Sequence, residues 1–357
     1  IVVLVLPPPL GDPATTEHTV RLVQPNAPQD EKWDPVKIPV FVNRLLTSTA
    51  ADARPDLILW PETAIPYLAH NAQPLLEAAA ERARGAPIVT GAQRYDNEQY
   101  FNSLLVVQTG GIVSHTYDKH HLVPVGEYLP FAPVMRRLGL RGLAENFGAG
   151  YGAGPGPQVL DFGALGTALP LICYEAVFAQ DVFQAPQRPN FLMQITNDAW
   201  FGKGKGPQQH LAQARMRAIE QGLPMARAAN TGISAMIGPR GQILASLPLN
   251  EAGYVDARLP EPLPPTLYSR WGDRPFLALL MVLLTVTALR IGHRAAMGAV
   301  GDLRWGLSAV ALLQTGVPLA LLGALMLAGL QDTPATLAIV LACAAPAITG
   351  SVNLALM

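Results

Sequence analysis

The stretch Ala168-Leu-Pro-Leu-Ile-Cys173-Tyr-Glu175 ends a short apolar run on a cysteine. An apolar run of this length predicts a buried strand, and functional side chains gather at the ends of such strands. Cys173 is one of two cysteines in 357 residues, and the other, Cys343, lies in a long uncharged stretch that is typical of a membrane segment. A disulfide between them is not expected. Cys173 is therefore a candidate free thiol nucleophile.

A base and a cation occur in similar strand-end positions. Glu62 follows the apolar run Leu57-Ile-Leu-Trp-Pro, and Lys119 follows His115-Thr-Tyr-Asp. We expect these side chains to converge with Cys173 on one rim of a sheet. A glutamate can accept the thiol proton, and a lysine can lower the thiol pKa and stabilise an oxyanion. The trio indicates acyl transfer, although each residue alone also fits packing, helix capping or solvation.

The composition separates a charged part from an apolar part. The 25 basic and 26 acidic residues nearly balance, which argues against an electrostatic nucleic-acid binder. Residues 305–330 and 333–357 contain no Asp, Glu, Lys or Arg. Each exceeds the roughly 20 residues that cross a bilayer core. They predict two further transmembrane helices of unknown role within 305–357.

An earlier apolar run predicts a first transmembrane helix at 276–292. Trp271 would mark one membrane interface and Arg290 the other, and the alternative is a buried or interfacial helix. Basic residues between this run and the next predict that their loop is cytoplasmic, which places the preceding domain outside. Residues 1–18 begin with six apolar residues before three prolines. We interpret them as the end of a truncated N-terminal membrane region.

Between 19 and 262 the pattern alternates β-like runs with helical stretches, which predicts βαβ units and a mixed sheet. The expected strands include 20–24, 56–60, 87–90 and 191–195, and the expected helices include 74–84 and 208–221. A glycine-rich segment at 140–158 predicts a mobile loop. Prolines concentrated at 260–265 predict a stiff linker over 263–275.

Several ordered motifs resemble one family. They are Leu59-Trp-Pro-Glu-Thr-Ala64, Asp118-Lys-His-His-Leu-Val-Pro-Val-Gly-Glu-Tyr128, Ile172-Cys-Tyr-Glu175, Thr196-Asn-Asp-Ala-Trp-Phe-Gly202 and Asn230-Thr-Gly-Ile-Ser234. In this order they resemble the nitrilase, or carbon–nitrogen hydrolase, superfamily and its Glu-Lys-Cys triad. Within that superfamily the sequence is most similar to the apolipoprotein N-acyltransferase family, from roughly 19 to 290.

The resemblance implies a nitrilase-like αββα sandwich at 19–262, followed by C-terminal transmembrane helices. It places the sandwich on the outer, periplasmic face of a bacterial inner membrane. It also implies a two-step reaction. Cys173 attacks an acyl ester of a phospholipid and forms a thioester, and the α-amine of a diacylglyceryl-cysteine at an apolipoprotein N-terminus takes the acyl chain. Glu62 would be the general base and Lys119 the oxyanion stabiliser.

Four more positions match functional positions of the family. Glu127 would hold the charge and position of Lys119, and Tyr174 would add a backbone oxyanion donor next to the family's Glu175 position. Trp33 matches a tryptophan on a loop near the lipid-facing site. The alternative is that Trp33 and Tyr174 only pack and that the two glutamates only pair with cations.

His120 and His121 suggest a metal site in isolation, but no Cys, Asp or His spacing nearby completes a zinc-type set. We interpret them as structural and predict neither metal nor cofactor. Two rival functions remain. One is a membrane-tethered amidase or nitrilase that uses the same triad with water as acceptor. The other is a catalytically inactive membrane scaffold, against which the intact Glu62, Lys119 and Cys173 argue.

Overall fold

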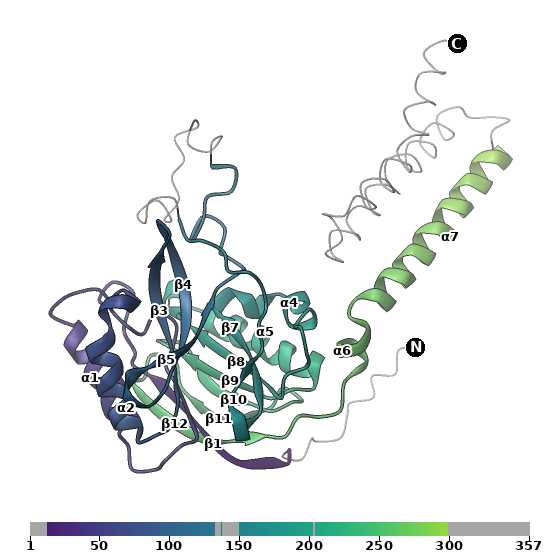
Figure 1. Cartoon of the computed structure of the whole chain (residues 1–357). Coiled ribbons are helices and arrows are strands. Elements are labelled where there is room, and N and C mark those ends of the chain that lie inside the picture. Colours follow the sequence, from purple (N-terminus) through teal and green to yellow (C-terminus); the bar gives the residue numbers. More distant parts are fainter. Residues whose placement is uncertain (1–12, 133–136, 138–149, 203, 299–357) are drawn as a thin grey trace. The chain divides into compact units, whose positions relative to one another are not determined.

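The computed structural model describes residues 13–132, 137, 150–202 and 204–298. The alternating pattern folds into two six-stranded mixed sheets (Figure 1). The first has the order β12-β1-β2-β3-β4-β5 and the second the order β11-β10-β9-β8-β7-β6. The strands of the first sheet are β1 (Thr15–Gln24), β2 (Leu57–Leu59), β3 (Ile88–Asp96), β4 (Gln99–Val107), β5 (Val113–Asp118) and β12 (Gly253–Pro260). Those of the second are β6 (Leu160–Asp161), β7 (Thr167–Ile172), β8 (Phe191–Thr196), β9 (Met225–Ala229), β10 (Ser234–Ile237) and β11 (Ile243–Leu247).

Each sheet has a parallel centre built from βαβ units, as the sequence predicts. In the first, β1, β2 and β3 are parallel, and α1 (Ile38–Thr49) and α2 (Gln73–Ala83) form the crossovers. In the second, β7, β8 and β9 are parallel, with α4 (Ala179–Phe183) and α5 (Gly206–Gln221) between them. Antiparallel strands complete both sheets, including the β4–β5 hairpin predicted at Gly110-Gly111.

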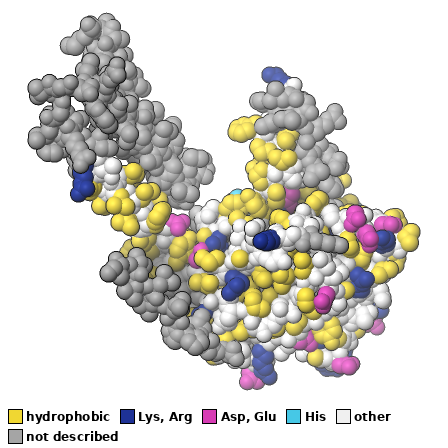
Figure 2. All heavy atoms as spheres, turned by 180° about the vertical axis from the view of Figure 1, so that it is seen from behind, with side chains coloured by type: hydrophobic (Ala, Val, Ile, Leu, Met, Phe, Trp, Pro, Cys, Tyr) yellow, Lys and Arg dark blue, Asp and Glu magenta, His cyan; other side chains and the backbone are white. Residues whose placement is uncertain are grey.

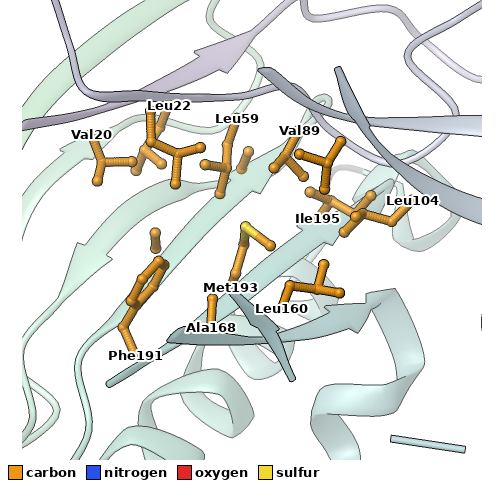
Figure 3. Packing of buried hydrophobic residues seen from close by; sticks show 14 of the residues in the cluster. Val20, Leu22, Leu59, Val89, Leu104, Leu160, Ala168, Phe191, Met193 and Ile195 are labelled. Atoms are coloured by element: carbon orange, nitrogen blue, oxygen red, sulfur yellow. The ribbon is translucent and has the colours of Figure 1, made fainter. Parts of the chain in front are cut away.

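The two sheets pack face to face on one apolar core. Side chains of β1, β2 and β3 face those of β7 and β8 there, and all are fully buried or nearly so (Figure 3). The labelled residues are Val20, Leu22, Leu59, Val89, Leu104, Leu160, Ala168, Phe191, Met193 and Ile195. Burying one such aliphatic side chain contributes about 1.5–3 kcal/mol. This shared core fixes the two sheets against each other.

The outer face of each sheet is covered by its own helices. Ile58 of β2 packs with Leu45 of α1 and Leu76 of α2. Leu171 of β7 packs in another cluster, with Val182 of α4 and Ala214 of α5. The layers therefore run helix, sheet, sheet, helix, with the helix pairs on opposite sides (Figure 1). The predicted αββα sandwich is confirmed.

Short 3-10 segments lie in the connections between these elements. They are η1 (Ala69–Asn71), η2 (Thr109–Gly111), η4 (Gly163–Leu165), η5 (Cys173–Val177) and η6 (Asp198–Phe201). The predicted loop 140–158 lies partly outside the described residues. Its described part is anchored, because Gly152 N donates to Tyr100 O at 2.7 Å and Gly154 N donates to Lys119 O at 2.9 Å.

The chain divides into two compact units, residues 1–269 and 270–357. β1 begins at Thr15, so residues 15–18 belong to the sandwich and not to the membrane region predicted at 1–18. The predicted linker 263–275 is partly helical, since it contains α6 (Leu267–Trp271) and the start of α7 (Arg274–Gly298).

Helix α7 spans the stretch 276–292 that the sequence assigns to a transmembrane helix. It exposes large apolar side chains (Figure 2). Phe276, Leu279 and Val282 are among them. Among the described residues, no helix has the length and apolarity that crossing a membrane requires. The span at 276–292 stays a prediction. The helices predicted within 305–357 lie outside the described residues.

One close backbone approach holds the loop after β2. Gly91 of β3 donates its N–H to Pro61 O at 3.1 Å, and its own carbonyl accepts from Ile65 N at 3.2 Å. A Cβ on Gly91 would lie 2.3 Å from Thr63 N and 2.6 Å from Glu62 Cα, which are backbone atoms with little room to move. Only glycine at this position lets the Glu62 backbone lie against β3.

Replacing Gly91 with alanine is expected to push the Glu62 loop away from β3 and to lower the free energy of unfolding by about 1–3 kcal/mol. Gly204→Ala is the control, because nothing lies within 4 Å of a Cβ at that position. Thermal unfolding of the full chain, followed by circular dichroism, measures both variants. Equal melting temperatures for the two variants would contradict this account.

Candidate active site

Cys173 stands at the first position after β7, where the chain turns sharply. Its φ of 52° is in the left-handed region, which costs a non-glycine residue about 1–3 kcal/mol. Two buried side chains hold its carbonyl oxygen in this turn. Gln194 Nε2 donates to it at 3.0 Å, and His210 Nε2 lies 3.1 Å from it. These contacts offset the strain and fix the direction of the thiol.

The two side chains on the Cys173 carbonyl belong to a buried polar network. His210 Nδ1 lies 2.8 Å from Asp198 Oδ1, and Arg227 Nη2 donates to Asp198 Oδ2 at 2.6 Å. Arg227 Nη1 also donates to Gln194 Oε1. Asp198 and Arg227 are fully buried. The network joins β8, β9, η6 and α5 behind the nucleophile and makes its position depend on the whole second sheet.

The Cys173 side chain is held as a thiol in the resting protein. Its burial raises its pKa, and the neighbouring Glu62 carboxylate raises it further, while Lys119 and a hydrogen bond with Thr196 lower it. The resulting pKa of the thiol lies well above the ordinary range of a cysteine. The sequence predicts that Lys119 lowers the thiol pKa, but in the structure burial and Glu62 outweigh the lysine. A reaction at Cys173 therefore requires a base.

Glu62, the predicted base, lies three residues beyond the end of β2 at Leu59. The side chain is buried, and each carboxylate oxygen accepts one hydrogen bond. Asn102 Nδ2 donates to Oε1 at 2.7 Å, and Asn197 N donates to Oε2 at 2.7 Å. Asn102 comes from the first sheet and Asn197 follows β8 of the second. Glu62 is thus oriented at the rim where the two sheets meet.

Lys119 follows β5 and is 1% exposed. Its Nζ donates to Glu127 Oε1 at 2.9 Å, and its backbone N–H donates to Asn102 O at 2.9 Å. Burial alone would lower the pKa of Lys119, but the Glu127 and Glu62 carboxylates outweigh it and raise this pKa. Lys119 is therefore positively charged at neutral pH. It interacts electrostatically with both Glu62 and Cys173, so the structure brings the three predicted catalytic residues together.

The two predicted supporting glutamates occupy different places. Glu127 contacts Lys119 directly and accepts from Val123 N at 2.8 Å through its other oxygen. Glu175 is fully buried and accepts from Ile172 N at 2.7 Å and from His120 N at 2.8 Å. Glu127 therefore holds the lysine, whereas Glu175 ties the turn before Cys173 to the segment after Lys119.

The two predicted aromatic residues lie at the edges of this cluster. Tyr174 packs edge-on against Phe178, with 4.9 Å between ring centroids. Trp33 is 41% exposed, and the Lys32 ammonium lies 5.6 Å from the centroid of its ring. Lys32 in turn donates to the backbone carbonyl oxygen of Glu62 at 3.3 Å. The loop that carries Trp33 is therefore hydrogen-bonded to the backbone of Glu62.

Sequence reasoning misses three residues of this site. Asn102 bridges two carboxylates, because its Nδ2 donates to Glu62 Oε1 and, at 3.0 Å, to Glu127 Oε1. Lys32 is buried, which lowers its pKa to about 8 against the opposing effect of Glu62. The third residue is His210, which contacts the Cys173 carbonyl oxygen together with Gln194. A sequence signal exists for the network behind Cys173, because Gln194 and Arg227 are long polar side chains in the middle of mainly apolar strands.

His120 and His121 lie beside a carboxylate that is distant from them in the sequence. Asp181 of α4, 60 residues from His121, lies 2.9 Å from His121 Nδ1 and 3.4 Å from His120 Nε2. The sequence near His120 and His121 does not reveal this third metal-ligating side chain, because Asp181 is remote in the chain. The fold brings a carboxylate to both imidazoles.

Asp198→Asn is expected to lower the free energy of unfolding at pH 7 by about 3 kcal/mol, because it leaves buried Arg227 uncompensated. Burial raises the Asp198 pKa, but Arg227 and His210 outweigh it and lower the pKa to about 2. The stabilisation is thus complete above about pH 4 and is lost as the pH falls toward 2.

Melting temperatures of the wild type and Asp198→Asn, taken from pH 7 to pH 2, test this expectation. The difference should shrink as the pH falls through the Asp198 pKa. Asp52→Asn is the control, since that side chain is exposed. A difference that stays constant down to pH 2 would show that Asp198 is not a stabilising buried carboxylate.

The comparison with protein families identifies the sandwich. Residues 19–263 match the carbon-nitrogen hydrolase family. Among solved structures, a carbon-nitrogen hydrolase from Helicobacter pylori G27 superimposes with a TM-score of 0.51 at 16% identity, covering 67% of this chain and 88% of that one. An amidase from Nesterenkonia sp. gives a TM-score of 0.50 at 22% identity, covering 75% and 97%. At these identities the likeness concerns the fold.

Curated relatives are more similar in sequence. An apolipoprotein N-acyltransferase of Sinorhizobium fredii is 42% identical over 298 residues, which is 80% of this chain and 56% of the relative. The enzyme of the same name from Bradyrhizobium diazoefficiens is 42% identical over 287 residues, 76% of this chain and 53% of the relative. This chain spans about half the length of these relatives. From the family match over most of its residues, the chain belongs to the carbon–nitrogen hydrolase family.

Proposed function

We propose that the protein transfers an acyl chain from a membrane phospholipid to the N-terminal amine of a diacylglyceryl-cysteine on apolipoproteins. The observation that carries this proposal is a buried thiol coupled to one oriented carboxylate and one positively charged lysine. The similarity to apolipoprotein N-acyltransferases over about three quarters of the chain supports the choice of substrates.

In the first step Glu62 takes the proton from Cys173 as Sγ attacks the ester carbonyl of the phospholipid. Lys119 stabilises the oxyanion of the tetrahedral intermediate. The intermediate collapses to a thioester, and Glu62 returns the proton to the departing lysophospholipid alkoxide. The raised thiol pKa agrees with this order, since Cys173 carries a proton until a base removes it.

In the second step the lipoprotein amine attacks the thioester carbonyl, and Lys119 again stabilises the oxyanion. Glu62 accepts the amine proton and passes it to the departing Cys173 sulfur. The thiol is thereby regenerated and an amide is formed. Glu127 supports both steps by holding Lys119, and Asn102 keeps the two carboxylates at fixed positions beside it.

Lipid substrates require the sandwich to work at a membrane. Helix α7 presents exposed apolar side chains, and the charge-free stretches within 305–357 are long enough to cross a bilayer. We infer attachment to the bacterial inner membrane with the sandwich on the periplasmic side. The half-exposed Trp33 is suited to contact acyl chains, because indole rings favour the membrane–water interface.

The rival is an amidase that uses the same residues with water as acceptor. Both reactions share the first half and differ in what attacks the thioester. The motif at Asn230-Thr-Gly232 and the similarity to the N-acyltransferases favour an amine acceptor. Hydrolysis of small amides or nitriles would favour the amidase.

The full chain in phospholipid vesicles, incubated with a synthetic diacylglyceryl-cysteine peptide, is expected to produce the N-acylated peptide, detected by mass spectrometry. Cys173→Ala should abolish the product, and Glu62→Gln should reduce it at least about 100-fold, because general base catalysis contributes about 10²–10⁴-fold. Asp52→Asn serves as the matched surface control.

A parallel assay with small amides and nitriles separates the rivals. Product from the lipid pair alone supports the acyltransferase. Hydrolysis of the amides without acyl transfer, unchanged transfer by Cys173→Ala, or no reaction with any of these substrates would contradict the proposal.

A further inference from the structure

Beside the catalytic cluster lies a second group of side chains that the proposed reaction does not use. His120 Nε2, His121 Nδ1 and Asp181 Oδ2 converge, and one ligand atom from each lies within 4.8 Å of the other two. Among the described residues this is the one such convergence of histidine, cysteine and carboxylate groups. Two imidazoles and one carboxylate form a donor set that suits zinc and similar divalent transition metals.

The ring of His120 is oriented as a metal-binding histidine would be. Its Nδ1 lies 2.7 Å from Glu175 Oε1, a carboxylate that is fully buried and also accepts from the Tyr117 hydroxyl at 2.9 Å. Metal-binding histidines characteristically donate one ring N–H to such a carboxylate and present the other nitrogen to the ion. Glu175 would thus orient the ligand without touching the metal.

The opposite nitrogen of His120 forms a long ion pair with Asp181 but no well-formed hydrogen bond among the described residues. Nε2 is buried and has no hydrogen-bond partner within the part of the chain that the structure describes, although Asp181 Oδ2 lies 3.4 Å away. A buried polar atom in this state costs about 1–3 kcal/mol. A cation between Nε2 and Asp181 would satisfy it.

His121, the other histidine of the group, is held in place but is accessible to solvent. The His121 ring stacks on Phe178 with 3.4 Å between centroids and 9° between planes. Its side chain is 34% exposed, so an ion can enter from solvent. In a tetrahedral zinc site with bonds of about 2.0–2.1 Å, ligand atoms lie roughly 3.3–3.4 Å apart. The separation of 3.4 Å between Asp181 and His120 matches this value, and the separation of 2.9 Å between Asp181 and His121 would have to widen by about 0.4 Å.

We propose that His120, His121 and Asp181 form a binding site for a zinc-type divalent cation, with Glu175 as the carboxylate that orients His120. Solvent would supply the fourth ligand. Its ligands include neither Cys173 nor Lys119. It would act on the catalytic cluster through Glu175, which accepts from Ile172 N at 2.7 Å, directly before the nucleophile.

Co²⁺ titration of the full chain, without a polyhistidine tag, tests the site directly. We expect one equivalent to bind and to give the intense visible absorption of tetrahedral Co²⁺, and Zn²⁺ to displace it. His121→Gln and Asp181→Asn should each weaken binding at least about tenfold, by comparison with the loss caused by removing outer-sphere partners. His115→Gln and Asp52→Asn are controls for surface histidine and aspartate, and both should bind as the wild type does.

Far-ultraviolet circular dichroism of each variant confirms that it is folded before titration. Absence of Co²⁺ binding would overturn the proposal and leave His120 as an imidazolium between two carboxylates. Equal binding by the site variants and the controls would also overturn it. A cobalt–thiolate charge-transfer band would do the same, by showing that a cysteine holds the ion.

Discussion

The structure depends on the burial of one lysine between two carboxylates at the rim of two sheets. A lone buried ammonium would lose its charge, since removing it from water is costly. Glu127 contacts Lys119 directly, and Glu62 acts on it at longer range, so the lysine stays charged. Asn102 donates to both carboxylates and so bridges them beside the lysine. The chemistry assigned to Cys173 requires all of these groups in a site sheltered from water.

The nucleophile is positioned from the other side by a second polar network. The strained turn at Cys173 persists because Gln194 and His210 bind its carbonyl oxygen. Those residues are held by Asp198 and Arg227 inside the second sheet. The first sheet therefore supplies the proposed base and the cation, and the second supplies the thiol. Packing of the two sheets on one apolar core brings these two groups of residues close together.

Much of this arrangement is predictable from the sequence because it follows local patterns. Apolar runs locate the ends of β2 and β7, and the hairpin signal at Gly110-Gly111 locates β5. Glu62, Cys173 and Lys119 lie just beyond these three strands. Asn102 and Asp181 are not predictable in this way, because only the tertiary fold shows what they contact. The thiol pKa illustrates the same limit. The presence of a lysine suggests a lowered pKa, but its value depends on burial and on Glu62, which chain spacing does not reveal.

The most direct test of the central claim is to withhold the acceptor amine and examine the protein itself. After incubation with phospholipid vesicles, peptide mapping by mass spectrometry should find one acyl chain on Cys173, removable by hydroxylamine as a thioester is. Acylation at another residue would contradict the account. So would N-acylation of an acceptor peptide, added afterwards, in the absence of any adduct on Cys173.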